Sequence, residues 1–337
     1  MLVSIIIPNF NREKLITETL NSVKVQTYSN WEALIVDDGS TDQSIKIIQE
    51  FIKNDSRFKL IKREREPKGA PTCRNIGVES AKGDFIIFLD SDDLLAPDCL
   101  KRRVSYCVQN PDLDFIVFQM LLFHKSVNDL NILGNIDTKE SDLYRFLRGD
   151  VVWGIFQPIW KSDSLKKLSG FDESLKCWQE YDLHLRALIK GLKYIKKFDI
   201  EPDCFCRHHI YESIGKSGKK NVDYVLSQER VLMNIIKDAH SVGNGFKLNV
   251  RVQLMNVCFN YANIGYHDNA KKLLGFAKEK ELFSTSQNYK LSLILTLYKY
   301  SLQNLKGFYR LRSILTNDIS LTSQHLKVKY LPKGNNE

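Results

Sequence analysis

The chain has 337 residues, of which 43% are hydrophobic and 26% are charged, as is typical of a globular protein. No apolar run approaches the roughly 18 to 20 residues that cross a bilayer, and the first residues lack the pattern of a signal peptide. The seven cysteines are scattered and include no Cys-x-x-Cys pair, which favours reduced thiols over a disulfide framework. We therefore expect a cytoplasmic protein.

The net charge of +9 is concentrated towards the C-terminus. Residues 221–337 contain 16 Lys and Arg against 8 Asp and Glu, whereas residues 1–220 contain 33 against 32. No nucleic-acid-binding motif accompanies this excess, so nucleic acid is not an expected partner. Peripheral contact with the anionic inner face of a membrane is the better hypothesis, and a solvated helix face or a homodimer contact are the alternatives.

Strands and helices are expected to alternate through the first 108 residues. Continuous apolar runs predict strands at 3–7, 31–36, 58–61 and 85–89, each followed by a segment with helical periodicity. Ser40 and Gln43 have capping-box spacing at the start of the second helix. This alternation at short spacing predicts βα units and a mostly parallel sheet flanked by helices.

After residue 108 strands and helices no longer alternate regularly, and the last third of the chain shows helical periodicity alone. Extended segments are expected at 114–120, 155–160, 193–198 and 204–208, together with a helix at 178–190. Helical periodicity alone follows at 223–239, 248–264, 268–278 and 287–305. We therefore expect an α/β domain over residues 1–220 and an all-helical appendage over residues 221–337.

Polar residues follow three of the predicted strands. Residues 90–93 place three carboxylates in four positions directly after a buried strand, and such carboxylates repel one another unless a cation faces them. The first strand ends in Pro8 and Asn9, and the second ends in Asp37 and Asp38. Ligands of α/β sheets bind at the carboxyl ends of the strands, so these turns predict a site for a nucleotide diphosphate and a divalent metal. An acidic loop that caps the next helix is the alternative.

Four motifs in this order resemble those of family 2 glycosyltransferases. They are residues 4–12 (SIIIPNFNR), 36–42 (VDDGSTD), 68–77 (KGAPTCRNIG) and 88–93 (FLDSDD). The resemblance covers about residues 2–215. It implies a GT-A (Rossmann-like) fold and the transfer of a sugar from a nucleotide diphosphate donor to an acceptor hydroxyl, with inversion.

The resemblance also implies roles for residues at the strand ends. Asp38 would bind the donor base, Asp90 would lie near the ribose, and Arg74 would lie near the nucleotide or the diphosphate. The metal, Mn²⁺ or Mg²⁺, would be held by Asp92 and His209, with His208 as the alternative histidine. The remaining expected donor-site residues are Pro8, Asn9 and Ser91. Arg74 could instead pair with a carboxylate of the site, and Asp37 is interpreted as stabilising the turn at Gly39.

The general base is expected at the start of a later helix. Family members usually carry a Glu-Asp-x-Asp-Leu run there, and residues 179–183 (QEYDL) depart from it at two positions. We assign the base to Glu180, with Asp182 as the competitor. Residues two positions apart on a helix are rotated by about 200° around its axis, so Glu180 and Asp182 cannot both face one substrate. Trp178 and Asp182 are candidates for the acceptor side, and Trp153 is expected in the core.

The expected reaction is the addition of one sugar per encounter, with a UDP-sugar favoured, to a growing surface glycan or a lipid-linked acceptor. The Gln-x-x-Arg-Trp motif of processive synthases is missing from the sequence. The departure at Gln179 and Glu180 leaves open a non-catalytic scaffold built on a transferase fold. A sugar nucleotidyltransferase is disfavoured because the loop after the first strand contains no glycine. A zinc site at Cys204, Cys206 and His208 is disfavoured because no second ligand pair matches it.

Overall fold

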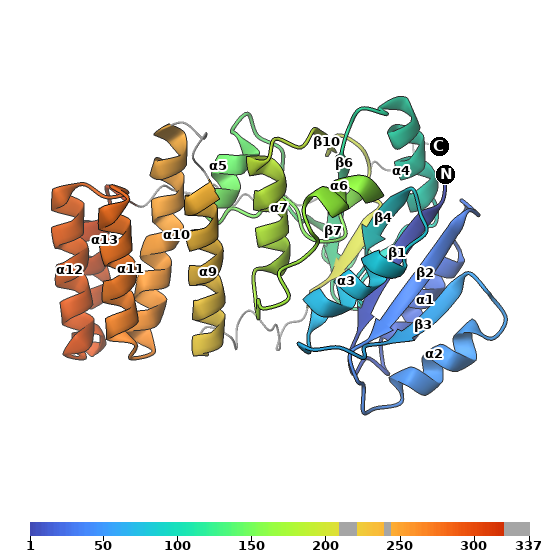
Figure 1. The fold of residues 1–337 in the computed structure, drawn as a ribbon, viewed down its shortest axis with the longest axis horizontal. Coiled ribbons are helices and arrows are strands. Elements are labelled where there is room, and N and C mark those ends of the chain that lie inside the picture. Colours follow the sequence, from blue (N-terminus) through green and yellow to red (C-terminus); the bar gives the residue numbers. More distant parts are fainter. Residues whose placement is uncertain (209–220, 239–243, 320–337) are drawn as a thin grey trace.

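A computed structural model describes residues 1–208, 221–238 and 244–319 as an α/β unit followed by a row of helices (Figure 1). The seven-stranded sheet has the order β10-β6-β9-β4-β1-β2-β3, and only β9 runs antiparallel to its neighbours. This confirms the expected mostly parallel sheet. The strands are β1 Val3–Asn9, β2 Trp31–Asp37, β3 Phe58–Lys62, β4 Phe85–Phe88, β6 Phe115–Phe118, β9 Pro158–Lys161 and β10 Tyr194–Lys197.

Helix α3 lies closely against β1. A Cβ atom added to Gly77 would come within 2.3 Å of Ile6 Cγ2, so only glycine permits this approach. The contact fixes α3 over the centre of the sheet and holds Arg74 and Asn75, one turn earlier, beside the site. The helices of this part of the chain are α1 Ile16–Lys24, α2 Ser44–Ile52, α3 Ala70–Ser80, α4 Cys99–Gln109, α5 Asp142–Leu147, α6 Ser162–Lys167 and α7 Gln179–Ile189.

A second, four-stranded sheet has the order β5-β11-β7-β8. The strand expected at 114–120 is present at Phe115–Phe118 but ends earlier than expected, because the chain leaves the first sheet at Gln119 and enters the second. The Gln119 side chain donates to the carbonyl of Asn135 and accepts from the amide of Met120, which interrupts the strand. The strands of this sheet are β5 Leu94–Leu95, β7 Met120–Phe123, β8 Ile132–Leu133 and β11 Cys204–Arg207.

From residue 221 onwards, the described residues form helices and no strands, as expected. The expected helix at 287–305 is wrong at its C-terminal end, because Ser301 has a left-handed φ of 58° that ends α12. A capping box not identified from the sequence joins Ser284 and Gln287 at the start of this helix. The helices are α9 Val222–Asp238, α10 Asn244–Asn263, α11 His267–Glu279, α12 Thr285–Lys299 and α13 Phe308–Thr316.

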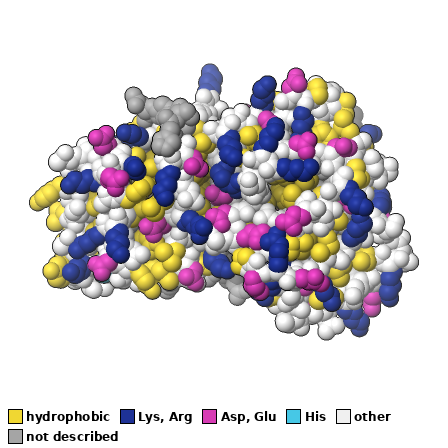
Figure 2. Space-filling model, viewed as in Figure 1, with side chains coloured by type: hydrophobic (Ala, Val, Ile, Leu, Met, Phe, Trp, Pro, Cys, Tyr) yellow, Lys and Arg dark blue, Asp and Glu magenta, His cyan; other side chains and the backbone are white. Residues whose placement is uncertain are grey.

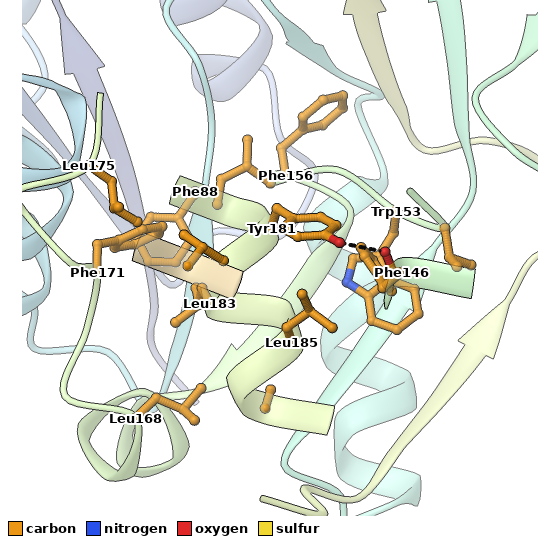
Figure 3. Packing of buried hydrophobic residues seen from close by; sticks show 14 of the residues in the cluster. Phe88, Phe146, Trp153, Phe156, Leu168, Phe171, Leu175, Tyr181, Leu183 and Leu185 are labelled. Atoms are coloured by element: carbon orange, nitrogen blue, oxygen red, sulfur yellow. Dashed lines mark hydrogen bonds between the residues drawn. The ribbon is translucent and has the colours of Figure 1, made fainter. Parts of the chain in front are cut away.

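The helical row packs directly against the α/β unit. Helix α9 contacts α7, and α10 contacts α5 so closely that a Cβ on Gly245 would lie 2.4 Å from the Tyr144 ring. Buried apolar residues of both parts form one continuous cluster. Within the α/β unit, the Tyr181 hydroxyl of α7 donates to the carbonyl of Phe146 in α5 (Figure 3). Among the helices described, none combines the length and apolar content needed to cross a membrane.

Candidate active site

Asp37 holds the turn that follows β2. Its carboxylate accepts hydrogen bonds from Asn9 Nδ2 at 2.8 Å and from the amides of Gly39 and Ser40 at 3.0 and 2.8 Å. This agrees with the turn-stabilising interpretation of Asp37. The expected capping box is wrong, because the Ser40 hydroxyl donates to Asp37 at 2.6 Å and α2 begins four residues later at Ser44.

Asp38 is buried beside the same turn and is paired with an arginine. Its Oδ1 accepts from Arg63 Nε at 2.6 Å and from the amide of Gly69 at 3.2 Å. The hydrogen bond to Asp38 raises the pKa of Arg63 above its ordinary value. The buried Cys73 thiol also contacts the Asp38 carboxylate. The sequence reasoning missed Arg63, although it directly follows β3, the strand next to β2.

Arg74 connects the end of β4 to the start of α7. Its side chain is 5% exposed, and its two terminal nitrogens donate to Asp90 Oδ1 at 2.7 Å and to Gln179 Oε1 at 2.9 Å. The guanidinium lies 5.4 Å from the centre of the Phe171 ring. This agrees with the interpretation that Arg74 pairs with a carboxylate of the site. Its position near a bound diphosphate stays a prediction.

Asn75 fastens the segment that precedes α7. It donates to the carbonyl of Phe171 at 2.9 Å and to Glu173 at 2.8 Å, and it accepts from the Phe171 amide at 2.9 Å. Burial would raise the pKa of Glu173, but its bonds to Arg65 and Asn75 outweigh burial and lower it. The sequence reasoning missed this role, although Asn75 follows Arg74 in the same motif.

The acidic turn after β4 faces cationic groups. Asp92 Oδ2 lies 3.5 Å from Arg12 Nε, and the Asp92 side chain is 17% exposed. Asp93 is buried and accepts from the amide of Arg207 at 2.8 Å. Burial, followed by the charges of Asp90 and Asp92, raises the pKa of Asp93 well above its ordinary value. Asp93 therefore closes the turn, while Asp90 and Asp92 are the carboxylates at the edge of the sheet.

The other expected donor residues lie at the same edge. Asn9 is buried at the end of β1, where Pro8 precedes it, and Ser91 is buried within the acidic turn. Asn9 Oδ1 is buried and has no hydrogen-bond partner among the described residues. Within the part of the chain that the structure describes, no three His, Cys, Asp or Glu side chains gather closely enough to hold a metal ion. His209, the expected metal ligand, lies outside the described residues, and His208, the alternative, is exposed directly after β11.

The two acidic candidates on α7 have different surroundings. Glu180 is half-buried in the first turn, and among the described residues its carboxylate makes no hydrogen bond or ion pair. Asp182 is buried and accepts from Arg186 Nε at 2.8 Å. Burial raises the pKa of Asp182, against the opposing charge of Arg186. Asp182 also lines a cavity of about 390 Å³ between α7 and α9, whereas Gln179, next to Glu180, is joined to Asp90 through Arg74.

Aromatic residues surround the rest of α7. Trp178 is half-buried, with its ring centre 4.7 Å from that of Tyr181. Trp153 is 1% exposed, which confirms its expected place in the core (Figure 3). His184 lies between Phe146, Trp153 and Trp160, and burial lowers its pKa to about 3. Neither ring nitrogen of His184 has a partner among the described residues.

Comparisons with known proteins agree with this geometry. Residues 4–153 match the profile of the family described as "Glycosyl transferase family 2". The Escherichia coli protein WfgD, named as a UDP-Glc:alpha-D-GlcNAc-diphosphoundecaprenol beta-1,3-glucosyltransferase, is 37% identical over 146 residues, which is 43% of this chain and 54% of WfgD. The chain spans about half the length of the curated relatives it matches.

Solved structures are similar over almost the whole chain. S. aureus TarS 1–349 in complex with UDP-GlcNAc has a TM-score of 0.59 at 20% identity, covering 94% of this chain and 92% of that one. The mannosyltransferase PcManGT from Pyrobaculum calidifontis, in complex with GDP-Man and Mn²⁺, has a TM-score of 0.55 at 16% identity, covering 94% and 84%. At these identities the similarity concerns the fold. Together with the family match over residues 4–153, it confirms the resemblance found in the sequence motifs: the fold is similar to that of GT-A transferases, and residues 4–153 are similar to family 2 glycosyltransferases.

Proposed function

We propose that the chain is an inverting glycosyltransferase that moves one sugar from a nucleotide diphosphate donor to an acceptor hydroxyl. The observation that carries the proposal is Glu180, a carboxylate with no hydrogen bond or ion pair among the described residues, whose neighbour Gln179 is joined through Arg74 to Asp90 at the end of β4. A proton acceptor is thereby linked to the predicted donor site. WfgD, named for a UDP-Glc donor and a diphosphoundecaprenol-linked sugar, and TarS, in complex with UDP-GlcNAc, favour UDP-sugars as donors and a lipid-linked or surface glycan as acceptor.

The donor would lie along the carboxyl ends of β1, β2 and β4. Asp38 would accept from a base N–H in addition to the bonds that it accepts from Arg63 and Gly69. The unpaired Asn9 Oδ1 at the end of β1 could accept a further hydrogen bond from the nucleoside. Pro8 and Ser91 would shape the surrounding loops. Asp90 would contact the ribose while Arg74 holds it in place.

Glu180 would act as the general base. The acceptor hydroxyl oxygen attacks the anomeric carbon from the face opposite the diphosphate, and its proton passes to the Glu180 carboxylate. The bond between the anomeric carbon and the diphosphate oxygen breaks with its electron pair, so the nucleoside diphosphate leaves as an anion. Glu180 then releases its proton to water. Trp178, which directly precedes α7, would offer an aromatic face to the acceptor sugar.

The strand-end carboxylates fit Mn²⁺ or Mg²⁺. Such sites usually need only one or two carboxylates, because the substrate phosphates supply other ligands. Asp92 Oδ2 lies 3.5 Å from Arg12 Nε, so an ion bound there would share this carboxylate with the Arg12 guanidinium. Asp92, with His209, would hold the ion. Once bound, it would neutralise charge on the leaving diphosphate. The structure of PcManGT in complex with GDP-Man and Mn²⁺ supports the same cofactor.

Hydrolysis of UDP-sugars in the presence of Mn²⁺ tests the proposal. We expect slow release of UDP from the wild-type chain, lost in Asp92→Asn and reduced about 10²- to 10⁴-fold in Glu180→Gln. Thermal shift with UDP and Mn²⁺ should be retained in Glu180→Gln. An Asp92→Asn variant with wild-type activity would refute the metal assignment. Binding of UDP-sugars without turnover by the wild-type chain would favour the scaffold alternative.

The helical region is proposed to contact an anionic membrane surface. The exposed side chains Tyr289 and Leu293 of α12, and Tyr300 at its C-cap, are spaced by four and seven residues along one side of the helix. The exposed cations Lys299, Lys306 and Arg310 lie on α12 or follow it. Figure 2 shows apolar side chains interspersed with Lys and Arg at this end of the molecule. Tyrosine, leucine and lysine together are typical of membrane-interface surfaces.

Sedimentation with phospholipid vesicles tests this contact. Replacing Lys299, Lys306 and Arg310 by Glu should release the protein from anionic vesicles at low salt and leave its weak binding to neutral vesicles unchanged. The matched control replaces Lys46, Lys53 and Lys101, exposed lysines of the α/β unit, by Glu. Equal losses in both triple variants would point to net charge alone. A change of molecular mass in the first variant would instead favour the homodimer alternative.

A further inference from the structure

The segment that leads into α7 is bonded to the first helix of the C-terminal row. The amide of Lys176 donates to the hydroxyl oxygen of Ser227 in α9 at 2.9 Å. The Ser227 hydroxyl in turn donates to the carbonyl of Asp223 at 2.8 Å, one turn earlier in α9. Ser227 is 5% exposed, so this two-step bond is partly shielded from water. Glu180 lies only four residues after Lys176.

Two further contacts join the same segment to α9. The Cys177 thiol donates to the carbonyl of Tyr224 at 3.3 Å. Burial, followed by the charge of Glu180, raises the pKa of Cys177 to about 12, so the thiol keeps its proton at neutral pH. Arg230 Nε also lies 3.3 Å from Asp172 Oδ2. Three side chains or carbonyls of α9 therefore hold residues 172–177.

The residue between this segment and α7 has an unfavourable backbone conformation. Trp178 has a φ of 61°, in the left-handed region that large side chains rarely adopt. Such a conformation persists only where the surrounding structure enforces it. On one side the enforcing contacts are those of Lys176 and Cys177 with α9. On the other side, α7 is anchored by Gln179 to Arg74 and by Tyr181 to Phe146.

Helix α9 is itself held in place by α10. Asn260 Nδ2 donates to Gln228 Oε1 at 3.0 Å, and the Tyr261 hydroxyl donates to Glu229. Helix α10 in turn reaches the α/β unit, where Gln253 Nε2 donates to the carbonyl of Arg148 at 2.8 Å. The path from the α/β unit through α10 and α9 to Lys176 thus consists of packed helices and buried or half-buried hydrogen bonds.

We propose that α9 positions the proposed base Glu180, with Ser227 as the principal positioning residue. The helical row is then a working part of the catalytic unit, in addition to any contact it makes with a membrane. Ser227 fixes the backbone of Lys176, and the strained Trp178 leads the chain into α7, so the first turn that carries Glu180 is held in place. The inference rests on the proposed function, because it concerns where the base lies.

Ser227→Ala tests the inference, with Ser292→Ala on the exposed face of α12 as the matched control. Small misplacements of a catalytic group cost up to about 100-fold, so we expect kcat for sugar transfer to fall about 10- to 100-fold in Ser227→Ala. The KM for the donor and the affinity for UDP should not change, because the donor contacts lie on β1, β2, α3 and β4. Hydrogen exchange should accelerate in residues 172–180. Ser227→Thr, which keeps the hydroxyl, should recover most of the turnover.

Several outcomes separate the inference from its alternatives. If exchange in residues 172–180 accelerates while kcat stays at the wild-type value, Ser227 has only a structural role and the inference is wrong. The same holds if kcat and UDP affinity fall together with the melting temperature. Should Ser227→Ala fail to fold, Arg230→Gln removes the exposed contact to Asp172 and should lower kcat about threefold, a tenfold change being about 1.4 kcal/mol. A wild-type chain without any transfer activity would contradict the proposed function, and the exchange rates would still show whether α9 restrains this segment.

Discussion

The carboxylates at the strand ends and the carboxylate at the start of α7 have opposite surroundings. Asp37, Asp38 and Asp90 each accept a hydrogen bond from an Asn or Arg side chain, whereas Glu180 accepts none among the described residues. A carboxylate held by donors keeps its position, which suits the binding of a ligand. A carboxylate without donors can contact the reacting hydroxyl of a substrate directly. The difference separates binding from proton transfer and places the two tasks on different elements.

Arg74→Gln should produce the largest effect, because Arg74 joins the two regions. The variant removes the bond to Asp90 at 2.7 Å and the bond to Gln179 at 2.9 Å, so the strand end and the start of α7 lose their link. We expect kcat/KM for transfer to fall about 100-fold, with contributions from both kcat and the donor KM. Steady-state kinetics at varied donor concentration measures the two contributions separately.

Arg65→Gln is the matched control for this change. Arg65 is more exposed than Arg74 and pairs with Glu173 and Glu79 on the outer side of α3. Its loss should change kcat/KM less than about tenfold, since surface ion pairs contribute little. The kcat/KM of Arg74→Lys should lie between the values for Arg65→Gln and Arg74→Gln, because an ammonium group cannot hold both partners in the fork geometry of a guanidinium. Wild-type kinetics in Arg74→Gln would show that the two regions are independent.

The sequence predicted those parts of the site that depend on local pattern. Strands β1, β2 and β4 were found because continuous apolar runs mark strands buried on both faces, and their ends brought Asn9, Asp38 and Asp90 to one edge. Asp37 was identified as a turn residue because Asp commonly bonds to amides two and three positions later.

The missed features depend on contacts between distant residues. Arg63 and Ser227 became recognisable only when folding placed them beside Asp38 and Lys176. The Ser40 capping box failed because the Ser40 hydroxyl oxygen accepts from the distant Asn11 amide and Asn9 side chain, and α2 begins only at Ser44. The break in the strand at 114–120 was missed because both of its halves are apolar, and a change of sheet at Gln119 cannot be recognised in an apolar pattern.

His184→Phe tests a fully buried titratable group of α7, in contrast to the half-buried Glu180. The folded His184 has a pKa of about 3 because it is buried, whereas an unfolded histidine titrates near 6.5. Below pH 6.5 the unfolded chain therefore binds a proton that the folded chain refuses, and stability is lost as the pH falls towards 3. At pH 5 this loss is about 2 kcal/mol. Urea unfolding at pH 7 and pH 5 should show a smaller acid loss in the variant.

The stability of His184→Phe at pH 7 provides the control for this measurement, because the aromatic residues around position 184 can also pack against a phenylalanine. Phe fits the stacked position beside Trp160, where the ring centres are 6.0 Å apart, so stability at pH 7 should change by less than about 1 kcal/mol. Glu173, whose pKa is lowered in the folded state, also loses stability on acidification, but it does so equally in both proteins. If His184→Phe lost as much unfolding free energy between pH 7 and pH 5 as the wild-type protein, His184 would not be the cause of the acid destabilisation.

Gln179→Glu should have the smallest effect and sharpens the comparison most. Glutamate has nearly the same shape as glutamine, so the hydrogen bond from Arg74 can persist and the link between the regions stays intact. Turnover at its optimal pH should change less than about threefold. The added negative charge beside Glu180 makes proton uptake there easier, so the acidic limb of the pH–rate profile should move to higher pH.

Gln179→Ala removes the bond without adding charge and should lower kcat while leaving the acidic limb in place. If the acidic limb fails to move in Gln179→Glu, a group other than Glu180 accepts the proton. The contrast between the hydrogen-bonded carboxylates at the strand ends and Glu180 on α7 would then not explain how the site divides binding from proton transfer.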